Sequence, residues 1–513
     1  MTGARGTKES GPAIRFGSAR GRWVLLASIL GSGLAGIDAT VVNVALPVIG
    51  RDFKVDFAAL QWTITAYTLT LASLILLAGA LGDRYGRRRV FLIGVVWFAV
   101  ASLLCGLAPG APWLIGARAL QGVGGALLTP GSLAMIQASF AREDRARAIG
   151  AWSAFGGVAT AIGPFLGGWL IQVASWRWVF LINVPLAVVV VLVAIRHVPE
   201  SRDPTATGRV DVLGAVLGVV GLGGVTYAII ETPARGLGSI AVLVTGTIGL
   251  LCLVAFGLAE ARQRNPMLPL TIFGSAQFSA ANAVTFLVYG AFGGVFFLLV
   301  VELQVVAGFS PIAAGTALLP VTVVMLLLSS RGGQLAQRIG PRLPMTLGPL
   351  ICAGAVLLML RIGPGAGYLT EVVPAVLVLG FGLALLVAPL TATVLAAVDV
   401  QHAGVASGVN NAVARAAGLI AVAALPAVAG LSGTAYDSAR SFQHGFRIVL
   451  ITCAGLLVLA AALAAATIRN TAALPEDRER PLDVTQCAIT GPSLAGARAA
   501  AASGSTQQLE RPS

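Results

Sequence analysis

Apolar residues recur along this chain in long runs, and short polar or glycine-containing segments separate each run from the next. Fourteen runs are long enough to cross a bilayer as helices, which requires about 20 residues. They cover residues 24–49, 58–81, 90–108, 112–136, 147–172, 178–196, 212–231, 240–260, 277–303, 311–330, 344–361, 370–396, 404–430 and 447–467. The pattern predicts an all-α polytopic membrane protein with 14 transmembrane helices.

The composition agrees with a membrane protein and changes how the charge is interpreted. Hydrophobic residues make up 57% of the chain and charged residues 11%, whereas soluble proteins carry about 25% charged residues. The net charge of +13 could indicate a nucleic-acid partner, but the basic residues lie in short loops between the apolar runs. We therefore interpret them as topology signals and expect no nucleic-acid partner.

The distribution of lysine and arginine predicts the orientation in the membrane. An even number of spans places both termini on one side, and 25 of the 34 basic residues lie on that side. The opposite loops hold seven, and Arg118 and Arg415 lie within spans. Since cytoplasmic loops are enriched in Lys and Arg, we expect both termini in the cytoplasm and the protein in a bacterial cytoplasmic membrane.

An internal repeat divides the chain into two halves. The glycine- and arginine-rich segment 79–88 recurs at 333–342 with a constant shift of 254 residues. Repeated halves around a midplane site are typical of transporters. The resulting boundaries are a cytoplasmic tail at 1–22, a six-helix bundle at 23–196, a linker with two inserted helices at 197–261, a second six-helix bundle at 262–467, and a disordered cytoplasmic tail at 468–513.

Asp38 lies about halfway along the first apolar run. A carboxylate near the membrane centre costs several kcal/mol, so such groups usually face a protein interior or a water-filled cavity. Asp38 is therefore the first candidate functional residue. The alternative is that it only forms a hydrogen bond to a neighbouring helix.

Arg118 is a second charge within a span and needs a partner. Asp38 is the acid expected nearest to it in depth. A carboxylate that alternates between a proton and this arginine could bind and release a proton in each transport cycle. A permanently structural Arg118, bonded to carbonyl groups of the first span, is an equal alternative.

Other polar and aromatic side chains within the spans are candidates for a substrate cavity. Asn43, Trp62, Tyr67 and Gln121 belong to the first, second and fourth spans, and Arg415 belongs to the thirteenth. Trp62 and Tyr67 could equally be anchors at the membrane interface. Arg415 faces the cavity or tethers neighbouring helices.

The loop after the second span combines glycines with one acid and four arginines. Its candidate residues are Gly79, Asp83, Arg84, Gly86 and Arg87. Asp83 can accept charge-assisted hydrogen bonds from an arginine or a helix N-terminus. Such a contact would latch two helices in one conformational state and break in another. The alternative is a basic anchor with two turn glycines.

In the fifth span, Gly163, Pro164, Gly167 and Gly168 form a small-residue segment. Glycines allow close helix approach, and the proline removes a backbone hydrogen bond and permits a bend. A packing seam with a kink is the simplest interpretation.

Two acids, Glu231 and Glu302, end the seventh and ninth spans. Either could contact cations at the external mouth, although a solvated helix end is the favoured interpretation.

Several of these motifs resemble those of one family. Segment 79–88 resembles the signature loop of the major facilitator superfamily, segment 118–126 its second motif, and segment 163–168 its antiporter motif; segments 37–47 and 175–185 resemble sequences of fourteen-span drug:proton antiporters. The resemblance covers about residues 24–467. It implies two six-helix bundles plus two inserted helices, and a kink in the fifth span that limits leak and favours exchange.

The resemblance implies a proton-motive-force-driven antiporter that exports drugs or other hydrophobic small molecules by alternating access. The alternative is a dedicated exporter of an endogenous metabolite, antibiotic or siderophore. The expected partners are the substrate, protons and the lipid bilayer, and we expect a monomer. The proton gradient is the energy source, and no cofactor is needed.

An enzyme is not expected, because no catalytic cluster is visible in the sequence. The three histidines have no metal-ligand spacing, and the five cysteines are scattered. A nucleotide-binding loop of the form Gly-x-x-x-x-Gly-Lys-Ser/Thr is absent from the sequence.

Overall fold

The computed structural model describes residues 14–202, 210–263, 266–399, 403–433 and 438–470. The disorder predicted for the tail at 468–513 falls almost wholly outside these residues. Within the described ranges, the regular secondary structure is helical throughout, with one isolated bridge between Ile14 and Phe140.

Fourteen helical segments in the described ranges are long and apolar enough to cross a membrane, which confirms the predicted fold class. The helices of the first part of the chain are α1 (Ala19–Phe53), α2 (Phe57–Tyr85), α3 (Arg87–Gly106), α4 (Ala111–Ser139), α5 (Arg142–Val173), α6 (Trp178–Leu181) and α7 (Asn183–His197). The two inserted helices are α8 (Val212–Arg235) and α9 (Ile240–Arg262). Helices α6 and α7 together form one span.

The second part of the chain follows α9. It contains η1 (Leu270–Gly274), α10 (Ala276–Val305), α11 (Pro311–Thr316), α12 (Leu319–Ile339), α13 (Arg342–Leu358), η2 (Met359–Arg361), η3 (Tyr368–Val372), α14 (Val373–Ala396), α15 (Ala403–Val428) and α16 (Ala439–Thr467). Here α11 and α12 share one span, as do η3 and α14.

Polar caps in the sequence explain where the long apolar helices begin. The Ser18 hydroxyl accepts a hydrogen bond from Gly21 N at 3.0 Å, so α1 starts at Ala19, a few residues before its apolar run. The Asp56 carboxylate accepts from Ala59 N at 3.0 Å and starts α2. Such side chains satisfy amide groups that have no partner within the helix.

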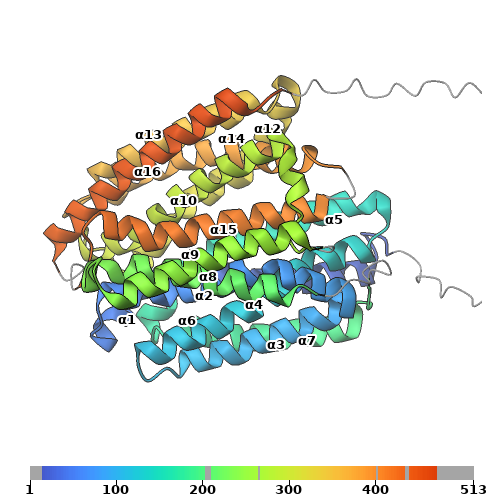
Figure 1. Ribbon diagram of the computed structural model, residues 1–513, viewed down its shortest axis with the longest axis horizontal. Coiled ribbons are helices and arrows are strands. Elements are labelled where there is room, and N and C mark those ends of the chain that lie inside the picture. Colours follow the sequence, from blue (N-terminus) through green and yellow to red (C-terminus); the bar gives the residue numbers. More distant parts are fainter. Residues whose placement is uncertain (1–13, 203–209, 264–265, 400–402, 434–437, 471–513) are drawn as a thin grey trace, which may run out of the picture. The chain divides into compact units, whose positions relative to one another are not determined.

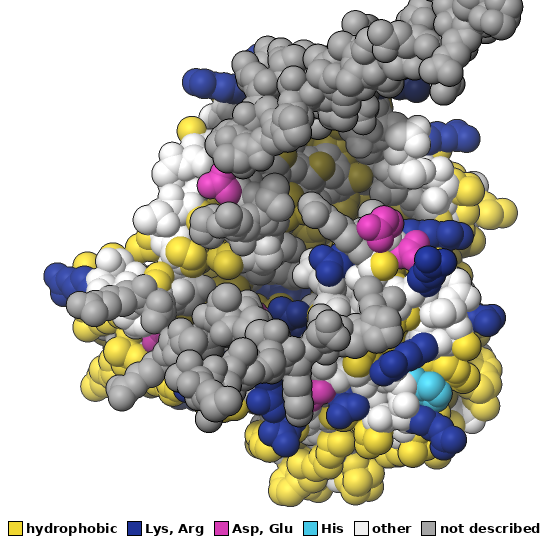
Figure 2. All heavy atoms as spheres, turned by 90° about the vertical axis from the view of Figure 1, so that its right-hand side faces the viewer, with side chains coloured by type: hydrophobic (Ala, Val, Ile, Leu, Met, Phe, Trp, Pro, Cys, Tyr) yellow, Lys and Arg dark blue, Asp and Glu magenta, His cyan; other side chains and the backbone are white. Residues whose placement is uncertain are grey.

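Helices α1–α7 pack mainly among themselves, as do α10–α16, and we call these two sets the first and second halves (Figure 1). We call the end at which α1 begins and α16 ends the terminal face, and the opposite end the distal face. Helix α8 packs against α9, α2 and α15, and so contacts both halves. Figure 2 shows the terminal face, with many arginine side chains and a recess whose floor is hydrophobic.

Contacts between the halves gather toward the distal face. Gln61 Nε2, on α2, donates to Val422 O of α15 at 2.8 Å. Gln304 Nε2, on α10, donates to Val44 O of α1 at 3.0 Å. Close packing of α5 against α11 adds to these contacts. The two halves are therefore closed against each other on the distal side.

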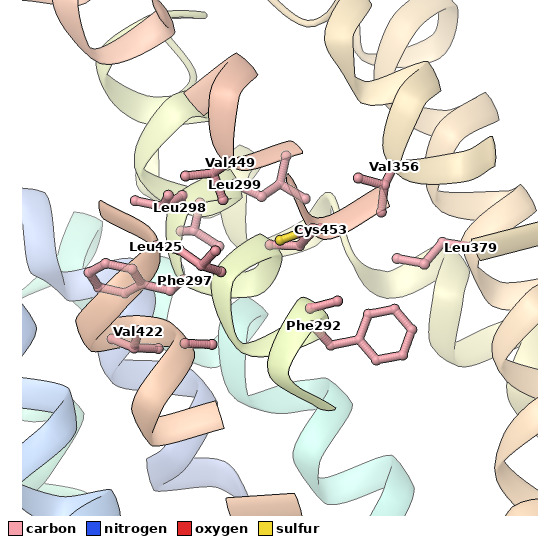
Figure 3. Packing of buried hydrophobic residues seen from close by; sticks show 14 of the residues in the cluster. Phe292, Phe297, Leu298, Leu299, Val356, Leu379, Val422, Leu425, Val449 and Cys453 are labelled. Carbon is pink, nitrogen blue, oxygen red and sulfur yellow. The ribbon is translucent and has the colours of Figure 1, made fainter. Parts of the chain in front are cut away.

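The core of the second half is an apolar cluster built around α10. The cluster includes residues of α10, α13, α14, α15 and α16, and it continues into α1, α2, α4 and α6 of the first half. Figure 3 shows several of its second-half members, including Leu298, Leu299, Leu379, Leu425 and Val449. These side chains are almost wholly buried. A polar group placed among them must find its own partner or stay neutral.

Candidate functional site

Asp38 is fully buried and holds three hydrogen bonds from side chains of two other helices. Arg118 Nη1, on α4, donates to Asp38 Oδ2 at 2.5 Å. Gln121 Nε2, one turn further along α4, donates to Asp38 Oδ1 at 2.8 Å, and Asn183 Nδ2 of α7 donates to the same oxygen at 3.1 Å. Both carboxylate oxygens are therefore occupied by donors, and one donor carries a positive charge.

Arg118 is as deeply buried as Asp38, with 1% of its surface exposed. Its Nη1 also donates to Gln121 Oε1 at 2.5 Å, and its Nε donates to Thr63 O of α2 at 3.1 Å. The carbonyl that it binds therefore belongs to the second span, whereas the structural alternative in the sequence analysis had placed it in the first.

Aromatic and small polar side chains surround the pair. The Arg118 guanidinium lies over the Tyr67 ring, with Cζ 4.3 Å from its centroid, and 5.7 Å from the Phe180 ring centroid. Ser102 Oγ, on α3, accepts from Gln121 Nε2 at 2.8 Å and from Asn183 Nδ2 at 3.4 Å. We call Asp38, Arg118, Gln121, Asn183 and Ser102 the Asp38 cluster.

The Asp38 cluster pairs a buried carboxyl group with a guanidinium and surrounds both with hydrogen-bond partners. A buried carboxylate is stable when it is paired and hydrogen-bonded, and Asp38 meets both conditions. A proton on Asp38 would remove the negative charge opposite Arg118 and leave the guanidinium unbalanced. Proton binding and the Asp38–Arg118 contact would therefore involve the same carboxyl group.

The roles of Asn183, Ser102 and Thr63 were not predicted from the sequence. Asn183 lies within the segment 175–185 that carried the family resemblance. Its amide side chain in an otherwise apolar run was the one feature of the sequence that could have indicated a role. Ser102 gave no such signal, because an isolated serine is common in membrane helices. Thr63 takes part through its backbone carbonyl, which no side-chain pattern reveals.

The candidate cavity residues lie in different environments. Tyr67 and Gln121 are buried in and around the Asp38 cluster, so neither lines an open space in this conformation. Trp62 Nε1 donates to Glu231 Oε1 of α8 at 3.4 Å. Asn43 is half-buried, and its Oδ1 has no hydrogen-bond partner in the described part of the chain.

Arg415 is half-buried on α15, and its Nε has no hydrogen-bond partner among the described residues. Helix α15 packs against α2 of the first half and against α10 of the second half. Its charge therefore lies between the two halves, unlike that of Arg118, which Asp38 neutralises.

In the signature loop, Asp83 pairs within its own segment. Its Oδ1 accepts from Arg87 Nε at 2.8 Å, one turn further along the chain. Gly86 has a φ of +115°, a conformation that favours glycine. The Arg84 guanidinium lies 5.5 Å from the Tyr85 ring centroid, and Gly79 lies near Pro130 of α4.

Glu200, which the sequence analysis missed, caps the start of α3. Its Oε1 accepts from Arg88 N at 3.1 Å and its Oε2 accepts from Arg89 N at 3.2 Å. A carboxylate at a helix N-terminus is favourable. The acid lies more than a hundred residues along the chain, so local sequence gave no indication of this contact.

The glycines of α5 allow contacts on two sides. Gly163 and Gly167 lie against α1, where a Cβ on Gly167 would come 2.5 Å from Val41 Cγ2. Gly168 faces the second half, where a Cβ would lie 2.5 Å from Pro311 O and 2.6 Å from Ile312 Cα. Pro164 lies against Gly315 of α11. The segment is thus part of the distal closure.

Glu231 and Glu302 differ from each other in their surroundings. Glu231 Oε2 accepts from Arg235 Nε at 2.7 Å, near the distal end of α8. Glu302 is fully buried, and both its carboxylate oxygens lack a hydrogen-bond partner in the described residues. The favoured interpretation of a solvated helix end is therefore wrong for Glu302, because the packing of the second half covers the end of α10.

Within the described ranges, no three His, Cys, Asp or Glu side chains gather as a metal site.

Comparison with known proteins gives consistent matches. The family model of the Major Facilitator Superfamily matches residues 28–423. The methylenomycin A resistance protein of Bacillus subtilis is 35% identical over 84% of this chain and 92% of its own length. The puromycin resistance protein pur8 of Streptomyces alboniger is 35% identical over 86% of this chain and 90% of its own length.

Similar proteins also include one named for export, and solved transporters share the fold. The cephamycin export protein CmcT of Amycolatopsis lactamdurans is 34% identical over 91% of this chain and 98% of its own length. A crystal structure of a bacterial homologue of the lysosomal transporter Spinster, inward-facing and unoccupied, matches with a TM-score of 0.59 and 20% identity, covering 88% of this chain and 98% of the other. A peptide transporter in complex with sulfate matches with a TM-score of 0.64 and 12% identity, covering 88% and 96%.

Proposed function

The chain belongs to the Major Facilitator Superfamily, and from that premise we propose that it is a proton-driven antiporter that exports drugs or other hydrophobic small molecules. As a member of this family with 14 membrane-spanning helices, it is a multi-pass membrane transporter rather than an enzyme. Its relatives include proteins named for resistance to, or export of, methylenomycin A, puromycin and cephamycin.

The observation that carries the proposal of proton coupling is the buried Asp38–Arg118 pair. A carboxylate this deep in the membrane is costly and marks a proton or ion pathway. Because a proton and Arg118 compete for Asp38, proton binding would free the guanidinium and loosen the contacts among α1, α4 and α7. Such a change could bias the first half between two arrangements.

Alternating access would act on the contacts between the halves. The distal contacts of α1, α2 and α5 with the second half are closed here, and we propose that they open to release substrate. We place the terminal face in the cytoplasm, because most loop arginines lie on that side. The proton-motive force supplies about 2.3 kcal/mol per charge for each 100 mV. This energy is sufficient to export a substrate against its concentration gradient.

For the substrate, the apolar recess on the terminal face supports a hydrophobic small molecule. Arg415 adds a positive charge without a counter-ion in its described surroundings. We therefore expect substrates that present a hydrogen-bond acceptor or an acidic group to this side chain. A dedicated exporter of one endogenous metabolite, antibiotic or siderophore is the second candidate, because the relatives are named for single antibiotics as well as for multidrug resistance.

Transport into everted membrane vesicles tests this proposal, with methylenomycin A and puromycin as probes. Wild-type vesicles should accumulate a probe when respiration acidifies their interior, and should lose it when an ionophore dissipates the pH gradient. Asp38→Asn vesicles should not accumulate it. Accumulation that persists without any proton gradient would contradict proton coupling.

A further inference from the structure

The two inserted helices bring a pair of carboxyl groups together at their terminal ends. Asp211 caps the start of α8, and Glu260 lies in the last turn of α9. Helices α8 and α9 pack side by side, as Figure 1 shows. Glu260 has 2% of its surface exposed, and Asp211 is half-buried. This pair belongs neither to the Asp38 cluster nor to the distal closure.

Each carboxyl group uses one of its oxygens to accept hydrogen bonds. Asp211 Oδ1 accepts from Gly214 N at 2.8 Å and from Gln263 Nε2 at 3.1 Å. Glu260 Oε2 accepts from Leu268 N at 2.9 Å. Because two of these three donors are backbone amides, both carboxyl groups are held in place where α8, α9 and the segment that leads to the second half meet.

The other oxygen of each group is buried, and the two face the same small space. Asp211 Oδ2 and Glu260 Oε1 have no hydrogen-bond partner in the part of the chain that the structure describes. Both border Gly214, where a Cβ would come 2.8 Å from Glu260 Oε1 and closer still to Asp211 Oδ2. The two oxygens therefore lie less than twice that distance apart.

Two ionised carboxylates this close would repel each other strongly away from water. When two carboxyl groups share a site, one of them normally keeps a proton. A proton between these oxygens would form a hydrogen bond from one group to the other and give both oxygens a partner. A metal ion would need several further oxygen ligands, and no third acid gathers here among the described residues.

The neighbouring helices supply no counter-ion to the pair. Helices α9, α2 and α15 pack against α8. In the described residues, the charged or titratable side chains of these helices nearest the terminal face are Arg262 on α9, Asp83, Arg84 and Tyr85 on α2, and Arg415 within α15. No salt bridge within the described ranges joins any of them to the pair.

We propose that Asp211 and Glu260 share one proton and so clamp the terminal ends of α8 and α9 together. The carboxyl group of one residue donates to the carboxylate of the other, and the pair carries one negative charge. Asp211 is half-exposed, so the proton can exchange with the solution on the terminal side. The inference goes beyond the proposed function, because no step of transport is assigned to this proton.

The clamp makes the junction of the inserted helices sensitive to pH. In the unfolded chain, the two separate carboxyl groups are both ionised at neutral pH. The folded protein therefore holds one more proton than the unfolded chain. The ratio of folded to unfolded protein then falls by up to about tenfold for each unit of rising pH, until the shared proton is lost.

Thermal unfolding of the purified full-length protein over a pH series tests this inference. Glu260→Gln is the decisive variant, because a carboxamide can accept from Leu268 N and donate to Asp211 Oδ2 without a proton to lose. Glu260→Ala removes both contacts. Glu231→Gln, near the distal end of α8, is the matched control for the loss of one acid.

In the wild type and in Glu231→Gln, the melting temperature should fall as the pH rises. Glu260→Gln should lose most of this decline and melt above the wild type at alkaline pH, whereas Glu260→Ala should melt below Glu260→Gln at every pH. The difference infrared spectrum between the wild type and Glu260→Gln at neutral pH should contain the carbonyl band of a protonated carboxyl group.

Melting temperatures of the wild type and Glu260→Gln that change in parallel with pH would overturn the inference. A rise in the melting temperature of the wild type with added magnesium, missing from Glu260→Gln, would also overturn it, because a cation would then occupy the gap. If Glu260→Gln fails to fold, Asp211→Asn supplies the comparison, since its side chain can still cap α8 and can donate to Glu260 Oε1.

Discussion

Asp38 lies buried in the middle of an apolar helix, and other helices bring hydrogen-bond donors to both of its oxygens. Arg118 and Gln121 come from α4, and Asn183 comes from α7. Each donor is itself held by a further contact, such as Ser102 Oγ for both amide groups. The pair is thus fixed in position, and its energy depends strongly on whether both charges are present.

Neutralising Asp38 alone should destabilise the protein as well as abolish coupling. Asp38→Asn leaves the Arg118 guanidinium buried without a counter-ion, a change that costs about 3–5 kcal/mol in known cases. The double variant Asp38→Asn with Arg118→Gln removes both charges and should recover most of that loss. Thermal unfolding in detergent measures the stability of each variant.

Transport in the same variants separates structure from coupling. If Asp38 carries the proton, the double variant should fold well and still fail to drive uphill export. Uphill export by the stable double variant would show that the pair is structural only, and the coupling acid would have to lie elsewhere.

Asn183 should contribute to the Asp38 cluster more than its small size suggests. Asn183→Ala removes one donor from the carboxylate and should lower the free energy of unfolding by about 1–3 kcal/mol, because a buried acceptor loses its partner. Asn43→Ala is the matched control, since Asn43 is half-buried with its Oδ1 unpartnered. Equal melting temperatures for Asn183→Ala and wild type would contradict the assigned contact.

At the scale of single residues, intramembrane charge was the signal that the sequence offered. Asp38 and Arg118 stood out because charges are costly in an apolar run. Ser102 and the carbonyl of Thr63 could not be found, because small polar groups and backbone atoms are common everywhere. Glu302 was visible, but its burial depends on how the second half packs around α10, which span boundaries do not reveal.

At the scale of elements, the glycines of α5 allow close contacts with α1 in the same half and with α11 of the other half. Gly163 and Gly167 serve the contact with α1, and Gly168 serves the contact with α11. These contacts come from two faces of one helix. The apolar pattern predicted the helix itself, and its resemblance to an antiporter motif gave no indication that one glycine of the segment meets the other half.

A side chain at Gly168 should hold the distal face open. In Gly168→Val, the new side chain would meet the backbone of Pro311 and Ile312, so closure should fail and transport should fall at least tenfold. Gly157→Val is the matched control on the same helix, because nothing lies within 4 Å of a Cβ there. Vesicle transport measures both, and normal transport by Gly168→Val would contradict the proposed closure.

The loop at the start of α3 illustrates why some element contacts escape prediction. Asp83 and Arg87 are one helical turn apart, so their pairing is local. Glu200 reaches the same loop from the segment that follows α7. Its partners are amide groups of the backbone, and sequence spacing alone cannot connect groups this far apart.

At the scale of the whole molecule, the fourteen spans and their order were predictable because each apolar run is long and separate. The sequence predicted two inserted helices, but it did not predict which other helices they pack against. The structure places α8 against α2 and α15, so it contacts both halves. The Trp62–Glu231 hydrogen bond belongs to this contact.

The orientation predicted from the arginines can be tested by thiol labelling in intact cells. Cysteine in place of Arg51, on the distal face, should react with a membrane-impermeant maleimide added outside. Cysteine in place of Arg20, on the terminal face, should react after the cells are permeabilised. Both residues are exposed. The reverse pattern of labelling would place the termini outside the cell.

The exchange of protons for substrate is the central claim, and proton movement in proteoliposomes tests it most directly. The liposomes contain a pH-sensitive dye, start without a pH gradient, and have their membrane potential clamped with potassium and valinomycin. The probe is whichever of methylenomycin A and puromycin the vesicles transport, and it is added outside. With the wild type, entry of the probe down its gradient should drive protons out and raise the internal pH, whereas Asp38→Asn should give no change. Internal acidification, or probe entry through the wild type with no pH change, would contradict proton antiport.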